Sequence, residues 1–170
     1  DVQIFIKKAL EIAKPLEKIL TTTYTQVYHR RKKEEPNCKQ LKEFFNSHNS
    51  IARKCHSCYK IQIEVNSLDD LFSLNFLMKS PRLELGNTRK CMVELRQNAK
   101  GYYKGLIYCS SIDEAKIVME KTKNHIDRMS KIKTIFTIKR GCTEFTNAHK
   151  EYGEIGENRQ LHQGPEQPQE

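Results

Sequence analysis

The feature that most constrains the fold is the order of strand-like and helix-like segments between residues 59 and 142. Four segments alternate apolar and polar side chains or are rich in β-branched and aromatic residues, as strands are: 59–65, 90–96, 102–109 and 134–140. Two apolar helical segments lie among them, one capped by Asn66 or Ser67 and one by Ser110 or Ser111. The resulting order, β-α-β-β-α-β, predicts an α+β ferredoxin-like domain at about 55–146. It would have four antiparallel strands in the spatial order 4-1-3-2 and two helices.

The rest of the chain divides into three further parts. Residues 1–35 predict an amphipathic helix or helices over 2–28 with a basic end, although the β-branched run Thr21–Thr23 weakens the second half. Residues 36–54 predict a second amphipathic helix and a linker, and residues 147–170 predict an acidic, disordered tail. A long apolar stripe needs a partner surface, so we expect the N-terminal helix to contact this domain or another protein.

The charge distribution favours a polyanionic partner. Residues 1–150 carry 29 Lys and Arg against 16 Asp and Glu, whereas residues 151–170 carry 1 against 5. A basic body attracts nucleic acid or anionic lipid, but Lys-rich helices also occur simply as solvated faces. We find no apolar run of the ~18 residues that a membrane span needs and no signal-peptide pattern, so we expect a cytoplasmic protein.

The predicted topology brings five of the six cysteines toward one edge of the sheet. These are Cys55 and Cys58 before the first strand, Cys91 at the start of the second, Cys109 at the end of the third and Cys142 after the fourth. Because neighbouring strands lie ~4.8 Å apart, Cys109 and Cys142 should flank the Cys-x-x-Cys segment. Cys91 should lie within a residue or two of the position opposite Cys109. Cys38 is outside this set, and we expect it to be incidental.

Four thiolates from a Cys-x-x-Cys pair and two single cysteines can complete a tetrahedral zinc site or hold an iron–sulfur cluster. The favoured ligands are Cys55, Cys58, Cys109 and Cys142, with Cys91 as a substitute and His56 as a weaker candidate. Buried cysteines also act as small hydrophobic residues, which is the competing interpretation for Cys91 and Cys109. Redox or disulfide chemistry is a third possibility.

A basic RNA- or DNA-binding domain with purely structural cysteines is the alternative function. The predicted element order is that of the RNA-recognition motif, in which strand aromatic residues stack on bases. The segment Lys104–Tyr108 resembles the third-strand signature of that motif, but Leu106 stands where a stacking aromatic is expected. On this hypothesis the contacting residues would be Lys100, Lys104, Tyr108 and Arg140.

The sequence does not contain a phosphate-binding glycine loop, a serine nucleophile motif or a His-Glu-x-x-His motif. Catalysis is therefore unsupported. The expected function is a non-catalytic, thiolate metal-binding interaction module of a larger intracellular protein.

Overall fold

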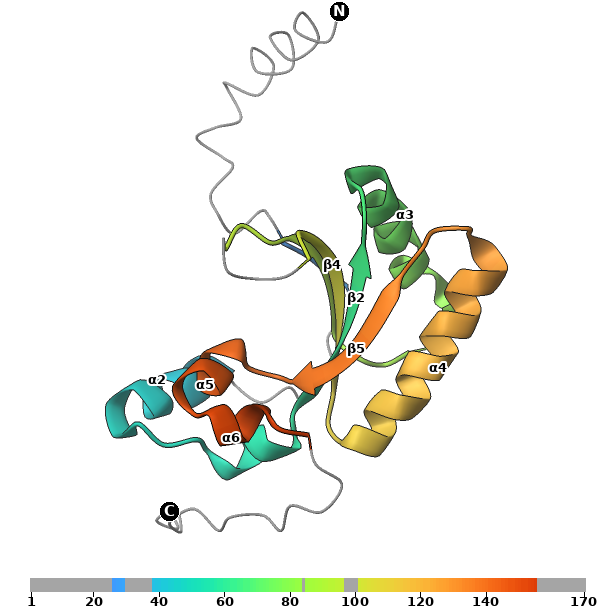
Figure 1. Cartoon of the computed structure of the whole chain (residues 1–170). Coiled ribbons are helices and arrows are strands. Elements are labelled where there is room, and N and C mark those ends of the chain that lie inside the picture. The colour runs from blue at the N-terminus through green and yellow to red at the C-terminus, as the bar shows by residue number, and fades with distance from the viewer. Residues whose placement is uncertain (1–25, 30–37, 84, 97–100, 156–170) are drawn as a thin grey trace, which may run out of the picture.

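The computed structural model describes residues 26–29, 38–83, 85–96 and 101–155. Their centre is one antiparallel sheet with the strand order β1-β3-β4-β2-β5 (Figure 1). The strands are β1 (Gln26–His29), β2 (Tyr59–Val65), β3 (Arg89–Val93), β4 (Tyr103–Cys109) and β5 (Ile135–Arg140). None of the helices in the described residues is long and apolar enough to cross a membrane.

The alternating side chains of β2 determine which face of the sheet is buried. Ile61 and Ile63 point to the core and are completely inaccessible to solvent. Ile61 pairs with Ile107 of β4 on one side and with Ile138 of β5 on the other, so one row of isoleucines crosses three strands. Burying such a row removes apolar surface from water and sets the register, because a one-residue slip would turn it to the opposite face.

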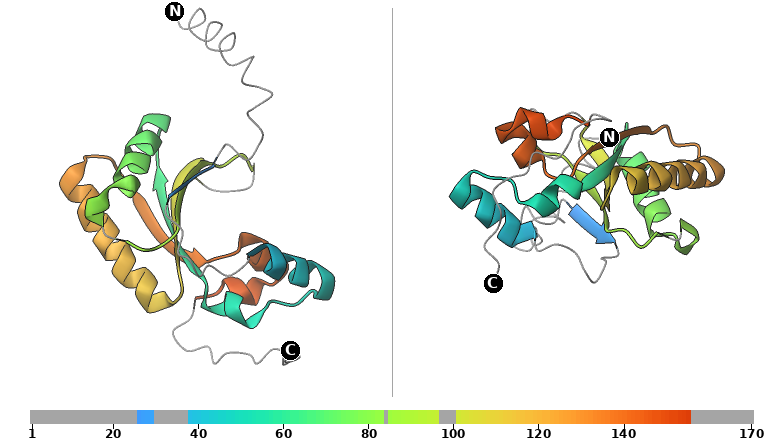
Figure 2. Two further views of the ribbon diagram at one scale, coloured as in Figure 1. Left: turned by 180° about the vertical axis from the view of Figure 1, so that it is seen from behind. Right: turned by 90° about the horizontal axis from the view of Figure 1, so that it is seen from below.

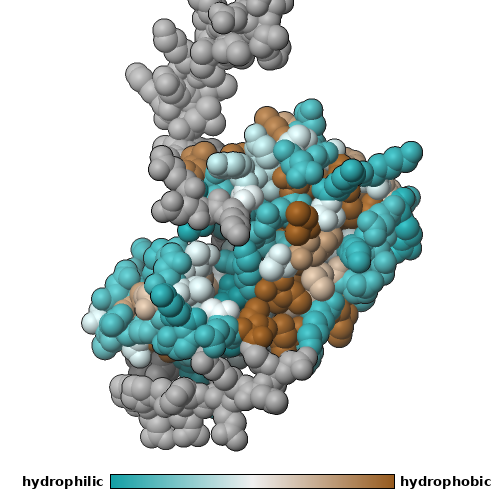
Figure 3. Space-filling model, in the orientation of Figure 1, coloured by the Kyte–Doolittle hydropathy of each residue, from teal (hydrophilic) through white to brown (hydrophobic). Residues whose placement is uncertain are grey.

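Helices α3 (Leu68–Lys79) and α4 (Ile112–Met129) cover this apolar face (Figure 2). Each begins at a serine cap: the Ser67 hydroxyl accepts from the Asp70 amide at 3.1 Å, and the Ser111 hydroxyl from the Glu114 amide at 3.0 Å. A short 3₁₀ helix, η4 (Pro81–Leu83), follows α3. Beside β5, an edge strand, hydrophobic side chains remain visible at the surface between the strand and α4 (Figure 3).

The remaining helices gather at one end of the sheet, away from α3 and α4 (Figure 1). They are α2 (Cys38–His48), the 3₁₀ helix η3 (Arg53–Ser57), α5 (Thr143–Ala148) and α6 (Lys150–Gly153). We call this group the cysteine module. It has its own small core of Ala52, Cys55, Phe145 and Tyr152, separate from the core under α3 and α4.

The structure corrects the predicted layout in two places. The sheet has five strands, not four, because residues 26–28, expected to end a helix, form part of β1, where Val27 pairs with Cys91 of β3. Val27 and its β-branched, aromatic-rich surroundings suit a strand, and the outer edge of β3 offers it backbone partners. The domain also has more helices than the two expected for it, because α5 and α6 follow β5, whereas α2 lies within the helix expected over residues 36–54. What remains is a mixed α+β fold.

The predicted disordered tail, 147–170, is also wrong over its first residues. The short helix α5 ends at Ala148 and α6 covers Lys150–Gly153, and Tyr152 is only 3% exposed. Phe145 and Tyr152 are buried in the small core of the cysteine module. Their burial stabilises this segment although the residues around them are mostly polar. The expected helix over residues 2–25 and the tail beyond 155 lie outside the described residues.

Candidate metal centre

The Cys-x-x-Cys segment forms a tight turn that leads directly into β2. The Cys58 amide donates to the Cys55 carbonyl at 3.2 Å, which closes the turn at the end of η3. The Cys58 carbonyl accepts from the Gly141 amide at 2.9 Å, so the end of β5 is joined to this turn. A methyl group on Gly141 would collide with the Cys58 sulfur, and glycine thus permits the close approach.

Cys142 follows Gly141 and is therefore held beside the Cys-x-x-Cys turn. Cys142 and Cys55 contact the same small core. Burial, and next the negative charge of a Cys142 thiolate, raises the pKa of Cys55 to about 11 and that of Cys58 to about 12. Like-charge repulsion weakens with distance, so these pKa shifts agree with the backbone contact that brings Cys58 and Gly141 together.

Cys38, which the sequence did not single out, belongs to the same group. It begins α2, and one turn later Lys42 forms an ion pair with Glu144 of α5 at 3.2 Å. Burial is the main cause of the raised pKa of Cys55, Cys58 and Cys142, and in all three a Cys38 thiolate raises the pKa further. The exposed Cys38 at the start of α2 therefore lies within electrostatic range of the other three thiols.

The side chains of Cys91 and Cys109 instead belong to the main core. Cys91 pairs with Gly105, four positions before Cys109, so the expectation that Cys91 faces Cys109 is wrong. The Cys91 sulfur lies 3.6 Å from the Met78 sulfur of α3, and burial raises the pKa of Cys91 to about 12. Cys109 lies opposite Tyr59, as the topology predicted, but its sulfur faces Asn87 at 3.8 Å. Both occupy the places of small hydrophobic residues.

His56, the weaker candidate, packs edge-on against the Tyr152 ring at 5.6 Å between centroids. Burial, followed by the charge of Arg140, lowers the pKa of His56. It therefore stays neutral at pH 7 and serves the packing of the module.

All six cysteines are free thiols. Across residues 38–83, 85–96 and 101–155, no three His, Cys, Asp or Glu side chains are already arranged as metal ligands. The four thiols of the cysteine module would therefore have to move before they could coordinate one ion. Comparisons with protein families, curated proteins and solved structures find no match.

The residues expected to bind nucleic acid have other contacts. Arg140 donates to the carbonyl groups of Tyr152 and His56, and its guanidinium lies 4.6 Å from the centre of the Tyr59 ring. Lys104 is buried and forms an ion pair with Glu94 at 3.2 Å. The Tyr108 ring lies on the face of the sheet opposite α3 and α4, which we call the open face, with Lys90 Nζ 5.8 Å from its centre. Lys100 lies outside the described residues.

Proposed function

We propose that this protein is a non-catalytic interaction module whose cysteine module binds one zinc ion through Cys38, Cys55, Cys58 and Cys142. The observation that carries the proposal is the backbone contact that holds Gly141 and Cys142 against the Cys55–Cys58 turn. The effect of a Cys38 thiolate on the pKa of Cys55, Cys58 and Cys142 supports Cys38 as the fourth ligand. A tetrahedral site of four thiolates with Zn–S distances of ~2.3 Å is the usual structural zinc site.

The electrostatics of the cysteine module support a bound cation. Burial and mutual repulsion disfavour the thiolate forms, and a divalent cation among them would reverse that balance by deprotonating the thiols. Two lysines also lie near: the charges of Lys60 and Lys42 act to lower the pKa of Cys142, although burial outweighs them. They would partly neutralise the negative charge of a zinc tetrathiolate.

The packing of the cysteine module also supports the proposal. Helix α2 has no fully buried residue, and the module core contains four buried residues. So small a core contributes little stability, and structural metals commonly supply what such units lack. The metal would tie the start of α2 to the start of β2 and the end of β5.

Two broader features belong to the same proposal. The segment β2-α3-β3-β4-α4-β5 would be a ferredoxin-like unit to which β1 and the cysteine module have been added, as its element order and strand order suggest. Free thiols suit a reducing compartment such as the cytoplasm.

The decisive experiment is metal and sulfide analysis of protein purified without oxygen, together with its visible spectrum. We expect about one zinc per chain and a colourless protein. Cys38→Ser and Cys58→Ser should lose the metal, whereas the matched controls Cys91→Ala and Cys109→Ala should keep it. Iron together with acid-labile sulfide would show that the same four cysteines hold an iron–sulfur cluster instead of zinc. Metal-free protein with six reactive thiols after unfolding, or full metal retention in Cys38→Ser, would overturn the proposed site.

A second candidate function is binding of single-stranded nucleic acid on the open face of the sheet. The exposed Lys139 of β5 and the half-buried Lys90 of β3 lie on this face and support it, whereas Lys60 is buried and donates to the Thr143 hydroxyl at 2.8 Å. Lys139→Glu should then weaken binding of a single-stranded oligonucleotide and reduce its salt dependence. Absence of binding at low salt would eliminate this candidate.

A further inference from the structure

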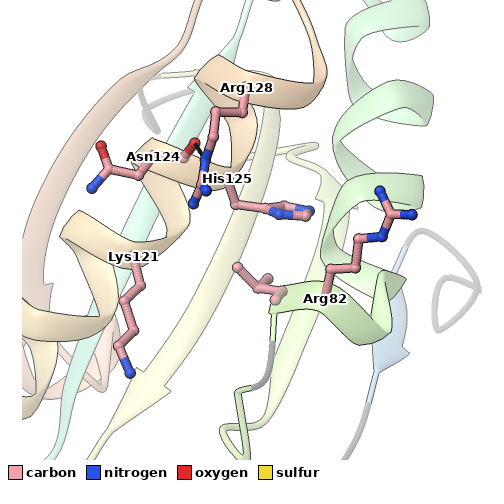
Figure 4. A pocket seen from close by; sticks show the side chains of 6 residues that line it. Arg82, Lys121, Asn124, His125 and Arg128 are labelled. Atoms are coloured by element: carbon pink, nitrogen blue, oxygen red, sulfur yellow. Dashed lines mark hydrogen bonds between the residues drawn. The ribbon is translucent and has the colours of Figure 1, made fainter.

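A groove on the opposite side of the molecule from the open face is lined by residues that take part in neither proposed function. It lies between η4 and the C-terminal half of α4 and has a volume of about 230 Å³ (Figure 4). Its lining consists of Arg82, Leu83, Lys121, Asn124, His125 and Arg128.

The described lining is entirely cationic or neutral. Arg82, Lys121 and Arg128 are exposed at its rim and come from two separate elements, η4 and α4. Arg128 Nε donates to the Asn124 carbonyl at 3.0 Å, which holds that guanidinium against the helix (Figure 4). Three cations around one small space repel one another, and an anion bound among them would relieve that repulsion.

His125 provides the observation that points to a ligand. Its side chain projects from α4 into the space between α4 and η4 (Figure 4). The residue is only 6% exposed, and its Nε2 atom is buried with no hydrogen-bond partner among the described residues. Buried polar atoms are nearly always paired, and an orphan is a place where a bound group is to be sought.

The surroundings of His125 favour a neutral imidazole, which can still donate one hydrogen bond. Burial, then the charges of Arg128 and Arg82, lowers the pKa of His125. A neutral imidazole with its proton on Nε2 would donate to a ligand oxygen, while the guanidinium groups supply charge and further donors.

We propose that this groove binds a phosphate group, with His125 at its floor and Arg82, Lys121 and Arg128 at its rim. Phosphate offers several acceptor oxygens and a charge near −2 at neutral pH, which matches several cationic donors around one buried imidazole better than a carboxylate does. Inorganic phosphate and the phosphomonoester of a small solute share this chemistry. The site is independent of the proposed metal centre.

The test is an NMR titration of the His125 imidazole signals in the full chain with inorganic phosphate, and separately with a nucleoside monophosphate, at constant ionic strength maintained with chloride. We expect saturable shifts and a raised pKa for His125, because a bound anion favours the imidazolium form. Arg82→Ala and Arg128→Ala should each weaken binding about tenfold or more, as expected on losing a charge-assisted hydrogen bond. Arg53→Ala, which removes an exposed arginine from η3, should leave binding unchanged.

The comparison of probes identifies the source of the phosphate. Tighter binding of the nucleoside monophosphate would identify an ester ligand, and equal binding would identify the phosphate group alone. The proposal is overturned if His125 does not respond to millimolar phosphate, if chloride causes the same shifts, or if Arg82→Ala and Arg128→Ala bind as tightly as Arg53→Ala.

Discussion

The Tyr152 hydroxyl donates a hydrogen bond of 2.9 Å to the backbone carbonyl of Cys55, 97 residues earlier in the chain. This bond joins α6 to the turn that carries two of the proposed metal ligands. Tyr152 is almost fully buried, and burial is the first cause of its raised pKa, followed by the thiolate charges of Cys142, Cys58 and Cys55. A residue of the expected tail is thus part of the cysteine module.

Tyr152→Phe should destabilise the protein by about 1–3 kcal/mol, because the buried Cys55 carbonyl loses its donor while the ring packing stays. Urea unfolding of the two proteins measures the difference. Tyr102→Phe, at a ring that is 64% exposed, is the matched control and should change stability by less than about 0.5 kcal/mol. Equal stability of Tyr152→Phe and the parent would mean that this bond contributes nothing.

Glu94 should make stability depend on pH in the acid range. Its carboxylate accepts from Arg96 at 2.7 and 2.9 Å and from Lys104 at 3.2 Å. The Arg96 bonds above all, against the opposing effect of burial, lower the pKa of Glu94 to about 2. Since the folded state holds the ionised form more strongly than the unfolded state, this contribution is complete above the ordinary pKa of 4.5. It is lost as the pH falls from about 5 toward 2.

Glu94→Gln should remove that part of the pH dependence. We expect the parent, measured by chemical denaturation at pH 7, 5, 4 and 3, to lose more stability than the mutant over the same steps. At pH 7 the mutant should be less stable by about 1.5–3 kcal/mol, the usual contribution of hydrogen bonds to charged groups. Parallel curves for the two proteins would contradict the low pKa of Glu94.

Gly105→Ala should strain the contact between β4 and α3. A methyl group at this position would lie 2.8 Å from the Met78 sulfur and 3.0 Å from Leu74 Cδ2. Overpacking of this kind costs about 1–3 kcal/mol. In a double-mutant cycle with Met78→Ala, the two substitutions should destabilise by less than their sum, because the smaller side chain makes room for the added methyl group. Additive effects would show that the strain is relieved elsewhere.

Gly141→Ala should weaken metal binding if the proposed centre exists. The added methyl group would displace the Cys58 sulfur, which lies directly against Gly141. Competition with a chromophoric chelator should show at least about tenfold weaker zinc affinity, as expected when a supporting residue of a metal site is changed. Thr137→Ala, in the strand β5 that precedes Gly141, is the control and should bind zinc as the parent does.

Much of the sheet could be predicted from the sequence because strand periodicity and serine caps are local signals. The alternation over residues 59–65 matches β2, and the Ser67 and Ser111 caps lie where the pattern indicated. Strand β1 could not be found in this way. It is only four residues long, and its position depends on pairing with the edge of β3, which begins 60 residues after β1 ends. Such a distant partner cannot be read from the residues around 26–29.

The candidate site was predictable only in part, for a related reason. Backbone register places Cys58 beside Gly141 and Cys142, and the predicted topology contained that relationship. Side-chain direction is a separate matter: Cys109 ends the correct strand, but its sulfur belongs to the main core. Cys38 depends on how α2 packs against α5. The available signal was its place at the start of an amphipathic helix with Leu41, Phe44 and Phe45.

The interior position of β2, between β4 and β5, has a consequence for the chain as it is synthesised. Tyr59 of β2 pairs with Cys109 and with Arg140, so both neighbours of this strand are translated long after it. Until Arg140 leaves the ribosome, Ile61 and Ile63 have an incomplete set of partners, and the nascent chain presents an apolar strand with an open edge. Nascent chains stalled before residue 135 should therefore bind holdase chaperones. Chains from which residue 140 has emerged should no longer bind them.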